Sequence, residues 1–76
     1  MSALKDKAAA FIGSKYRADV LRVKAAFDAG GIAHADELCR EIQAANNLRV
    51  WESLAFAESC RRCIAGHDFA PYGAQQ

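Results

Sequence analysis

Three cysteines and one histidine are the residues of this sequence best suited to hold a metal ion. Cys60, Cys63 and His67 are spaced by three and four positions, which places them on one side of a helix and its end, and Cys39 lies earlier in the chain. Zinc takes four such ligands in a tetrahedron, and a small domain gains folding free energy from binding it. A zinc-stabilised regulatory protein that uses Cys39, Cys60, Cys63 and His67 is therefore one hypothesis.

The same cysteines have a simpler interpretation. A free cysteine behaves as a small apolar residue, and all three fall on or beside faces that the sequence predicts to be buried. One CxxC pair with a single further cysteine is also much less specific than two paired CxxC motifs. We therefore expect ordinary buried thiols and no cofactor, with zinc binding and redox sensing as the alternatives.

No other group of residues predicts an enzyme. A cysteine nucleophile needs a base, a third group that orients the base and an oxyanion site, and the sequence has no Gly-rich turn or strand end to build them. Asp36, Glu37 and Glu41 lie on the polar side of a predicted helix, which is typical of a solvated face. Gly30-Gly31 lacks the strand and the Lys-Ser/Thr of a phosphate loop. A non-enzymatic protein is expected.

The charge balance argues against nucleic acid as the main partner. Ten basic and nine acidic side chains leave a net charge of +1, whereas nucleic acid favours clustered lysine and arginine. Two predicted helices joined by Asn46-Asn47 allow a helix-turn-helix arrangement, but its recognition helix would be mostly apolar and would offer only Arg49, Arg61 and Arg62 to DNA. A dimeric DNA-binding transcriptional regulator is kept as a second alternative.

Helices position all of these residues, and no alternating strand pattern competes with them. Alanine is abundant and the single proline is Pro71, so nothing before residue 70 forbids a helix. The first helix is predicted over 3–29 and ends at Gly30-Gly31. Unbroken, it would be about 40 Å long, against roughly 30 Å for a compact globule of this size. It must therefore kink, with Gly13 as the expected site, or protrude. Its apolar positions recur at steps of three and four: Leu4, Ala8, Phe11, Ile12, Tyr16, Val20, Val23 and Phe27.

Two further helices complete the prediction. One spans 33–45 and stops at Asn46-Asn47, because asparagine tolerates the left-handed conformation at a helix end. The other spans 48–65 and stops at Gly66, and a tail follows over 67–76. The expected fold is an all-α three-helix bundle in a single domain over 1–76, with a long first helix and a helical hairpin.

The helix over 48–65 provides the best clue to function, because more than half of its circumference is apolar. A chain of this length buries only about 60% of its unfolded surface, and two other helices cannot easily cover so wide a face. A homodimer or another protein partner would cover the rest. The predicted stripes on this helix are Val50, Leu54, Ala57 and Ile64 on one face, Phe56, Cys60 and Cys63 beside it, and Trp51 and Ala55 on the far side.

The function expected is therefore a protein–protein interaction module that acts as a small regulator or inhibitor and forms a homodimer. Phages and mobile elements encode inhibitors of host machinery, and such inhibitors are one class of protein that has about this length and no catalytic motif. The odd number of cysteines, the lack of a signal-peptide core and the lack of a membrane-spanning segment favour the cytoplasm. Aromatic residues and arginine dominate interface energetics. The candidate partner-binding residues are Arg49, Trp51, Phe56, Arg62 and Tyr72.

Overall fold

The first helical stretch of the chain bends at Tyr16. In the computed structural model, which describes residues 3–66, α1 (Ala3–Lys15) is followed by α2 (Arg17–Ala45) and α3 (Val50–Ile64). Tyr16 leaves the helical conformation, with φ −112° and ψ 38°. Gly13, where the sequence analysis placed the kink, is buried inside α1 and remains helical. The expected kink is present, but it lies three residues further along the chain.

The bend at Tyr16 allows residues on both sides of it to enter the same core. Ile12 in α1 and Val20 in α2 are both 0% exposed. The Tyr16 ring packs edge-on against the ring of Phe56, with centroids 6.2 Å apart and an interplanar angle of 85°. A straight helix through this point would exceed the dimensions of the molecule, which measures 30 × 25 × 22 Å. The bend is therefore fixed by packing, without a glycine or proline at the site.

A second break lies inside α2, at Gly31. Its backbone adopts φ 83° and ψ −170°, a conformation that is essentially restricted to glycine. Gly30 is tightly packed, since a Cβ there would lie 2.8 Å from Cβ of His34. The helix stop predicted at Gly30-Gly31 is confirmed. Below, residues 17–30 are called the first arm of α2 and residues 32–45 its second arm.

The connection from α2 to α3 is short and hydrogen-bonded. Asn47 has φ 51°, the left-handed conformation predicted for this asparagine pair. The backbone N–H of Leu48 donates to the carbonyl oxygen of Gln43 over 3.1 Å, and the Gln43 side chain donates to the carbonyl oxygen of Ser53 over 2.9 Å. These bonds fix the angle at which α3 leaves α2. At its other end α3 stops before Gly66, which has φ 93°.

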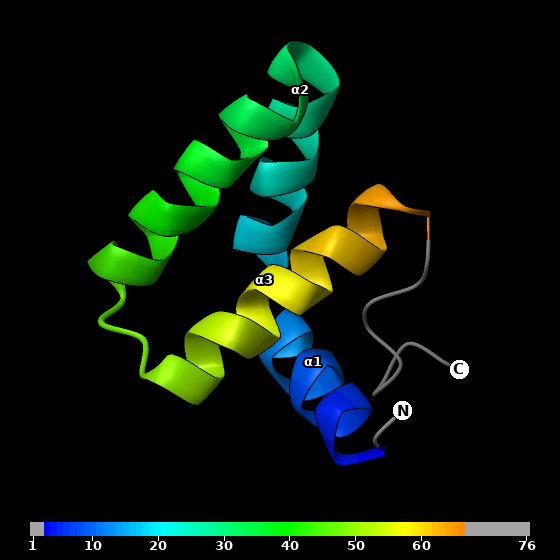
Figure 1. Ribbon diagram of the computed structural model, residues 1–76, viewed down its shortest axis with the longest axis vertical. Helices are drawn as coiled ribbons and strands as arrows, with labels where there is room; N and C mark the ends of the chain where they lie inside the picture. Colours follow the sequence, from blue (N-terminus) through cyan, green and yellow to red (C-terminus); the bar gives the residue numbers. More distant parts are fainter. Residues whose placement is uncertain (1–2, 67–76) are drawn as a thin grey trace.

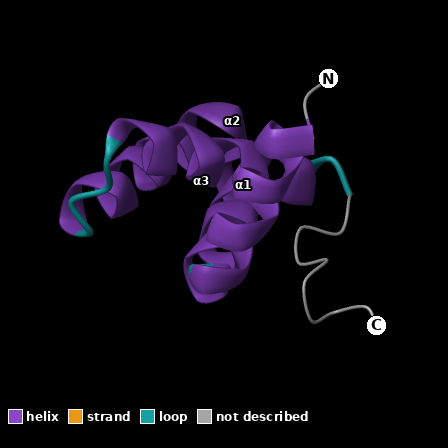
Figure 2. Cartoon of the chain, turned by 90° about the horizontal axis from the view of Figure 1, so that it is seen from below, coloured by secondary structure: helices purple, strands orange, loops and turns teal. Residues whose placement is uncertain are grey.

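α3 packs against both α1 and α2 and is the central element of the fold (Figure 1). The approach to α1 is close because the facing residues are small: Ala9 is 2% exposed, and its carbonyl oxygen accepts a 3.1 Å hydrogen bond from Oγ of the buried Ser59. Figure 2 shows the same three helices from below, with no strand among residues 3–66. The all-α, three-helix fold is thus confirmed for this part of the chain.

The core lies where α3 crosses the other two helices. Its largest member is Phe56, surrounded by residues of both arms of α2 and by the carboxyl-terminal half of α1. None of the helices described over residues 3–66 combines the length and apolar character needed to cross a bilayer. The residues of the main cluster are Ile12, Val20, Val23, Ala35, Cys39, Ile42, Ala55, Phe56, Cys60 and Cys63.

Candidate functional site

One apolar stripe of α3 lies in the core and another on the surface, a division that the sequence did not predict. Val50 and Leu54, predicted on one stripe with Ala57 and Ile64, are 79% and 68% exposed. The neighbouring stripe that contains Phe56 is buried instead, and Phe56 itself is 0% exposed. Phe56 was a candidate for partner binding, but a side chain packed in the core presents nothing to a partner. Trp51 keeps its place on the surface and is 49% exposed.

The two candidate arginines differ in their roles. The backbone N–H of Arg49 donates to Oε1 of Glu52 over 2.8 Å, so this residue caps α3 while its side chain stays exposed. Arg62 forms ion pairs with Glu58 at 3.0 Å and with Asp6 of α1 at 2.6 Å. Arg62 therefore ties α3 to α1 and is occupied within the chain. Tyr72, the remaining candidate, lies outside the described residues.

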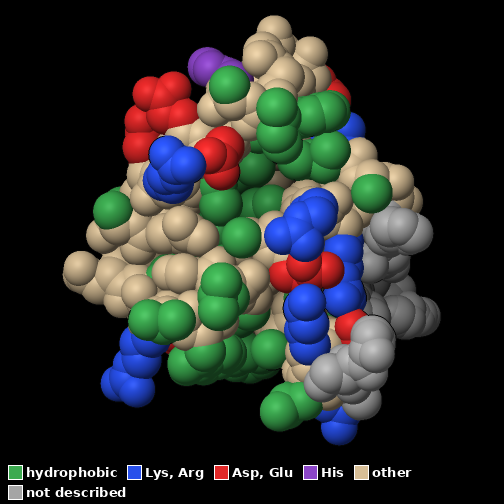
Figure 3. Space-filling view, in the orientation of Figure 1, with side chains coloured by type: hydrophobic (Ala, Val, Ile, Leu, Met, Phe, Trp, Pro, Cys, Tyr) green, Lys and Arg blue, Asp and Glu red, His purple; other side chains and the backbone are tan. Residues whose placement is uncertain are grey.

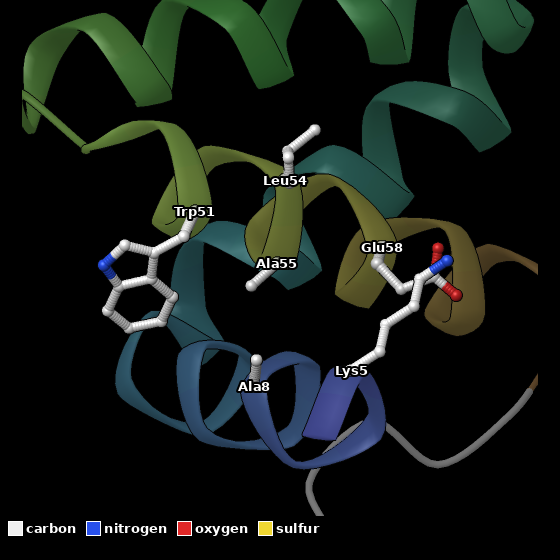
Figure 4. Close-up of a pocket in the computed structure, with 6 residues that line it drawn as sticks. All are labelled: Lys5, Ala8, Trp51, Leu54, Ala55 and Glu58. Atoms are coloured by element: carbon white, nitrogen blue, oxygen red, sulfur yellow. The ribbon is translucent and has the colours of Figure 1, made fainter. Parts of the chain in front are cut away.

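A groove of about 240 Å³ runs between α1 and the amino-terminal half of α3. Its middle is formed by two alanines, one from each helix, and this shortage of side-chain volume is what leaves the groove open (Figure 4). The Trp51 indole stands at one end, and the Lys5 and Glu58 side chains lie together at the other (Figure 4). We call this the α1–α3 groove, lined by Lys5, Ala8, Trp51, Leu54, Ala55 and Glu58.

Exposed apolar side chains flank the groove. On α1, Leu4 and Phe11 are 76% and 51% exposed and stand four and three positions from Ala8, which places them on the same helical stripe. On α3, Val50 adjoins Trp51. Figure 3 shows hydrophobic side chains gathered over the amino-terminal end of α3. Sequence reasoning placed Val50 and Leu54 on an apolar stripe but proposed only Trp51, of these three residues, for partner binding.

The polar end of the groove is charge-balanced. The guanidinium of Arg62, hydrogen-bonded to Glu58, holds the pKa of that carboxyl below its usual value, and the positive charges of Arg61 and Lys5 act in the same direction. Glu58 is therefore ionised near neutral pH and fixed by its neighbours. A partner at this site meets an apolar groove with a fixed, paired carboxylate at one end.

The four predicted metal ligands are only partly brought together. Cys39 and Cys60 line the same pocket, which Cys63 does not, and the charged groups that act on Cys63 all lie on the first arm of α2. Across residues 3–66, no three His, Cys, Asp or Glu side chains are grouped as a metal site would require. His67 lies beyond that range, so the four-ligand set stays a prediction, which elemental analysis of the full chain for zinc would test.

Two of the three arginines predicted to face DNA form ion pairs within the chain, and the dimeric DNA-binding regulator stays a prediction. α3 packs against α1 on one side and against α2 on another, and Arg61 and Arg62 are both paired with Glu58.

A search of protein families, of curated proteins and of solved structures finds no match to this chain.

Proposed function

We propose that this protein is a non-enzymatic interaction module, a small regulator or inhibitor that forms a homodimer through the α1–α3 groove and the apolar residues beside it. The observation that carries the proposal is the exposure of Val50, Trp51 and Leu54 on two successive turns of α3, at 79%, 49% and 68%. Three large apolar side chains together on the surface of so small a chain gain free energy when a partner covers them.

The groove supplies a complementary shape for the same interaction. Its alanine-lined middle can receive one large apolar side chain, and tryptophan is among the residues that contribute most to binding when they are buried at an interface. In a two-fold dimer each copy presents the same surface to the other. Leu54 and Trp51 of one copy would then lie against the groove of its partner and be covered in return.

A second protein could use the same surface, which is how a regulator or inhibitor of this kind would act. Binding of a target by the monomer would compete with self-association, because both need Trp51 and Leu54. The dimer would then be the resting form, and the target would displace one copy. Self-association is the part of this proposal that can be measured without knowing the target.

The test is the mass of the full chain in solution as a function of concentration, by sedimentation equilibrium or native mass spectrometry. The wild type is expected to shift from monomer to dimer as concentration rises, and Leu54→Lys is expected to stay monomeric. Since Leu54 is 68% exposed, that substitution should change the free energy of unfolding by only about 0.5 kcal/mol.

Leu21→Lys is the matched control. Leu21 is also an exposed leucine, at 46%, but it lies on the first arm of α2 and does not line the groove. It should leave the dimer intact. A wild type that remains monomeric at high concentration, or a dimer equally weakened by both variants, would show the proposal to be wrong.

A further inference from the structure

Two cysteines from different helices meet beneath a second pocket, away from the α1–α3 groove. Cys39 lies on the second arm of α2 and Cys60 on α3, both line this pocket, and each thiol shifts the pKa of the other. They are 7% and 4% exposed. Both are free thiols. The two helices thus bring both thiols to one cavity, and nearness of the sulfur atoms is the main geometric requirement for a disulfide.

The pocket gives small molecules a path to this thiol pair. It measures about 160 Å³ and opens between the second arm of α2 and the carboxyl-terminal half of α3. Hydrophobic side chains gather around this recess (Figure 3). Ile32, 68% exposed, stands at its rim. The residues that matter here are Val23, Ile32, Ala35, Cys39, Cys60 and Ile64.

We propose that Cys39 and Cys60 are an oxidation site at which hydrogen peroxide, entering through this pocket, produces an intramolecular disulfide. In the first step the thiolate of one of the two cysteines attacks one peroxide oxygen and the O–O bond breaks. The released hydroxide leaves as water with the proton that this thiol lost on ionisation, and the cysteine becomes a sulfenic acid. In the second step the sulfur of the other cysteine attacks the sulfenic acid sulfur, the S–O bond breaks, and hydroxide leaves as water with the thiol proton of the attacking cysteine. Two thiols lose two electrons, and one peroxide becomes two waters.

Each thiol affects the ionisation of the other. Interaction with Cys60 lowers the pKa of Cys39, although burial and the nearby Asp36 carboxylate act in the opposite direction. Interaction with Cys39, together with burial, raises the pKa of Cys60. The two thiols are therefore close enough to interact, and the product is the same disulfide whichever of them attacks peroxide first.

Cys63 provides an internal contrast. It lies one turn beyond Cys60 on α3 and is also buried, at 7% exposed, but it does not line the pocket. Burial is the main cause that raises its pKa. The charged groups that act on Cys63 lie on the first arm of α2, whereas those that act on Cys39 lie on the second arm. Cys63 is expected to take no part in the disulfide.

The test treats the full reduced chain with hydrogen peroxide and maps the linkage by peptide mass spectrometry. The expected product is a monomer that has lost two hydrogen atoms, with Cys39 joined to Cys60. The cross-link ties the second arm of α2 to α3 and restricts the unfolded chain, so the Tm should rise by about 10 °C and fall back on reduction. Mapping the wild type makes the result independent of whether a cysteine variant folds.

Three variants sharpen the test. Cys63→Ser should form the same disulfide at the same rate. Ile32→Trp should block the rim of the pocket and slow oxidation several-fold, whereas Leu21→Trp, an equally bulky change outside the pocket, should not. A disulfide that includes Cys63, a disulfide between chains, a chain that peroxide leaves reduced, or equal rates for Ile32→Trp and Leu21→Trp would overturn the proposal.

Discussion

Replacing Phe56 with alanine tests the division of α3 into a buried and an exposed stripe. Phe56 is 0% exposed and is the largest fully buried side chain in the described part of the chain. Removing such a ring from a packed core costs about 3–5 kcal/mol, from lost transfer free energy and from the cavity left behind. A chain of 76 residues is expected to have a total stability of about 4–11 kcal/mol. Phe56→Ala should therefore remove a large share of the stability and leave the domain partly unfolded at 37 °C.

The assay is urea unfolding at 25 °C, followed by circular dichroism and by fluorescence of Trp51, the only tryptophan. Phe11→Ala is the matched control, because Phe11 is 51% exposed and its removal should cost only about 1 kcal/mol. Phe56→Leu keeps the experiment measurable if the alanine variant is unfolded in water, with an expected loss of about 1–2 kcal/mol. Equal losses for Phe56→Ala and Phe11→Ala would refute the assignment of Phe56 to the core. If Phe56→Ala had normal stability but no longer dimerised, Phe56 would have to be assigned to the binding surface.

Two further predictions concern the bend in α2 and the ion pairs of α3. Gly31→Ala should destabilise the fold by about 1–3 kcal/mol, since φ 83° with ψ −170° is strained for an L-residue. D-alanine at position 31, introduced by chemical synthesis, should be tolerated. Equal losses of stability for the two variants in urea unfolding would contradict the strain argument. Arg62 lowers the pKa of Glu58 below 4.5 in the folded state, so Glu58 contributes stability that is present above pH 4.5 and lost as the pH falls through the folded pKa. In urea titrations below pH 4.5, the wild type should therefore lose more stability than Glu58→Gln. Parallel pH profiles for the two proteins would show that the pairing contributes nothing.

Local signals in the sequence were sufficient to predict several parts of the fold. Glycine and asparagine mark chain reversals because few other residues adopt a positive φ, and Gly31, Asn47 and Gly66 all have it. Apolar spacing of three and four placed Ile12, Val20 and Val23 on a buried face, and all three lie in the core. These features depend on a residue and its near neighbours, so they can be recognised without tertiary contacts.

The bend at Tyr16 could not be predicted, because its cause is distant in the sequence. No proline or glycine stands at that position, and the apolar stripe continues through it without a change of phase. The chain bends there because the Tyr16 ring packs against Phe56, forty residues further along by numbering, and because Ile12 and Val20 must enter one core. Gly13, the weaker helix former, stays helical and is buried within α1.

The exposed apolar surface of α3 was predicted only in part, because its position also depends on tertiary contacts. The sequence correctly indicated that α3 has more apolar area than two helices can hide, but periodicity alone does not say which of two adjacent stripes faces inward. In the fold the stripe that contains the large Phe56 faces inward, and Ser59 on the same side of α3 donates its hydroxyl proton to the Ala9 carbonyl oxygen. A serine offers no hydrophobic signal, so sequence reasoning had no ground for placing it inside. With Phe56 and Ser59 inside, helical geometry places Val50 and Leu54 outward.

The same close packing explains why α3 carries a recess on each side. α1 approaches α3 through alanines, which leaves the α1–α3 groove where larger side chains would have filled it. The second arm of α2 diverges from the first at Gly31 and meets α3 through Ala35 and Cys39, which leaves the smaller pocket above the thiols. Small residues at both contacts bring the helices together and leave space beside them. The surface proposed for binding and the site proposed for oxidation therefore both follow from small side chains at helix crossings, with α3 as the element they share.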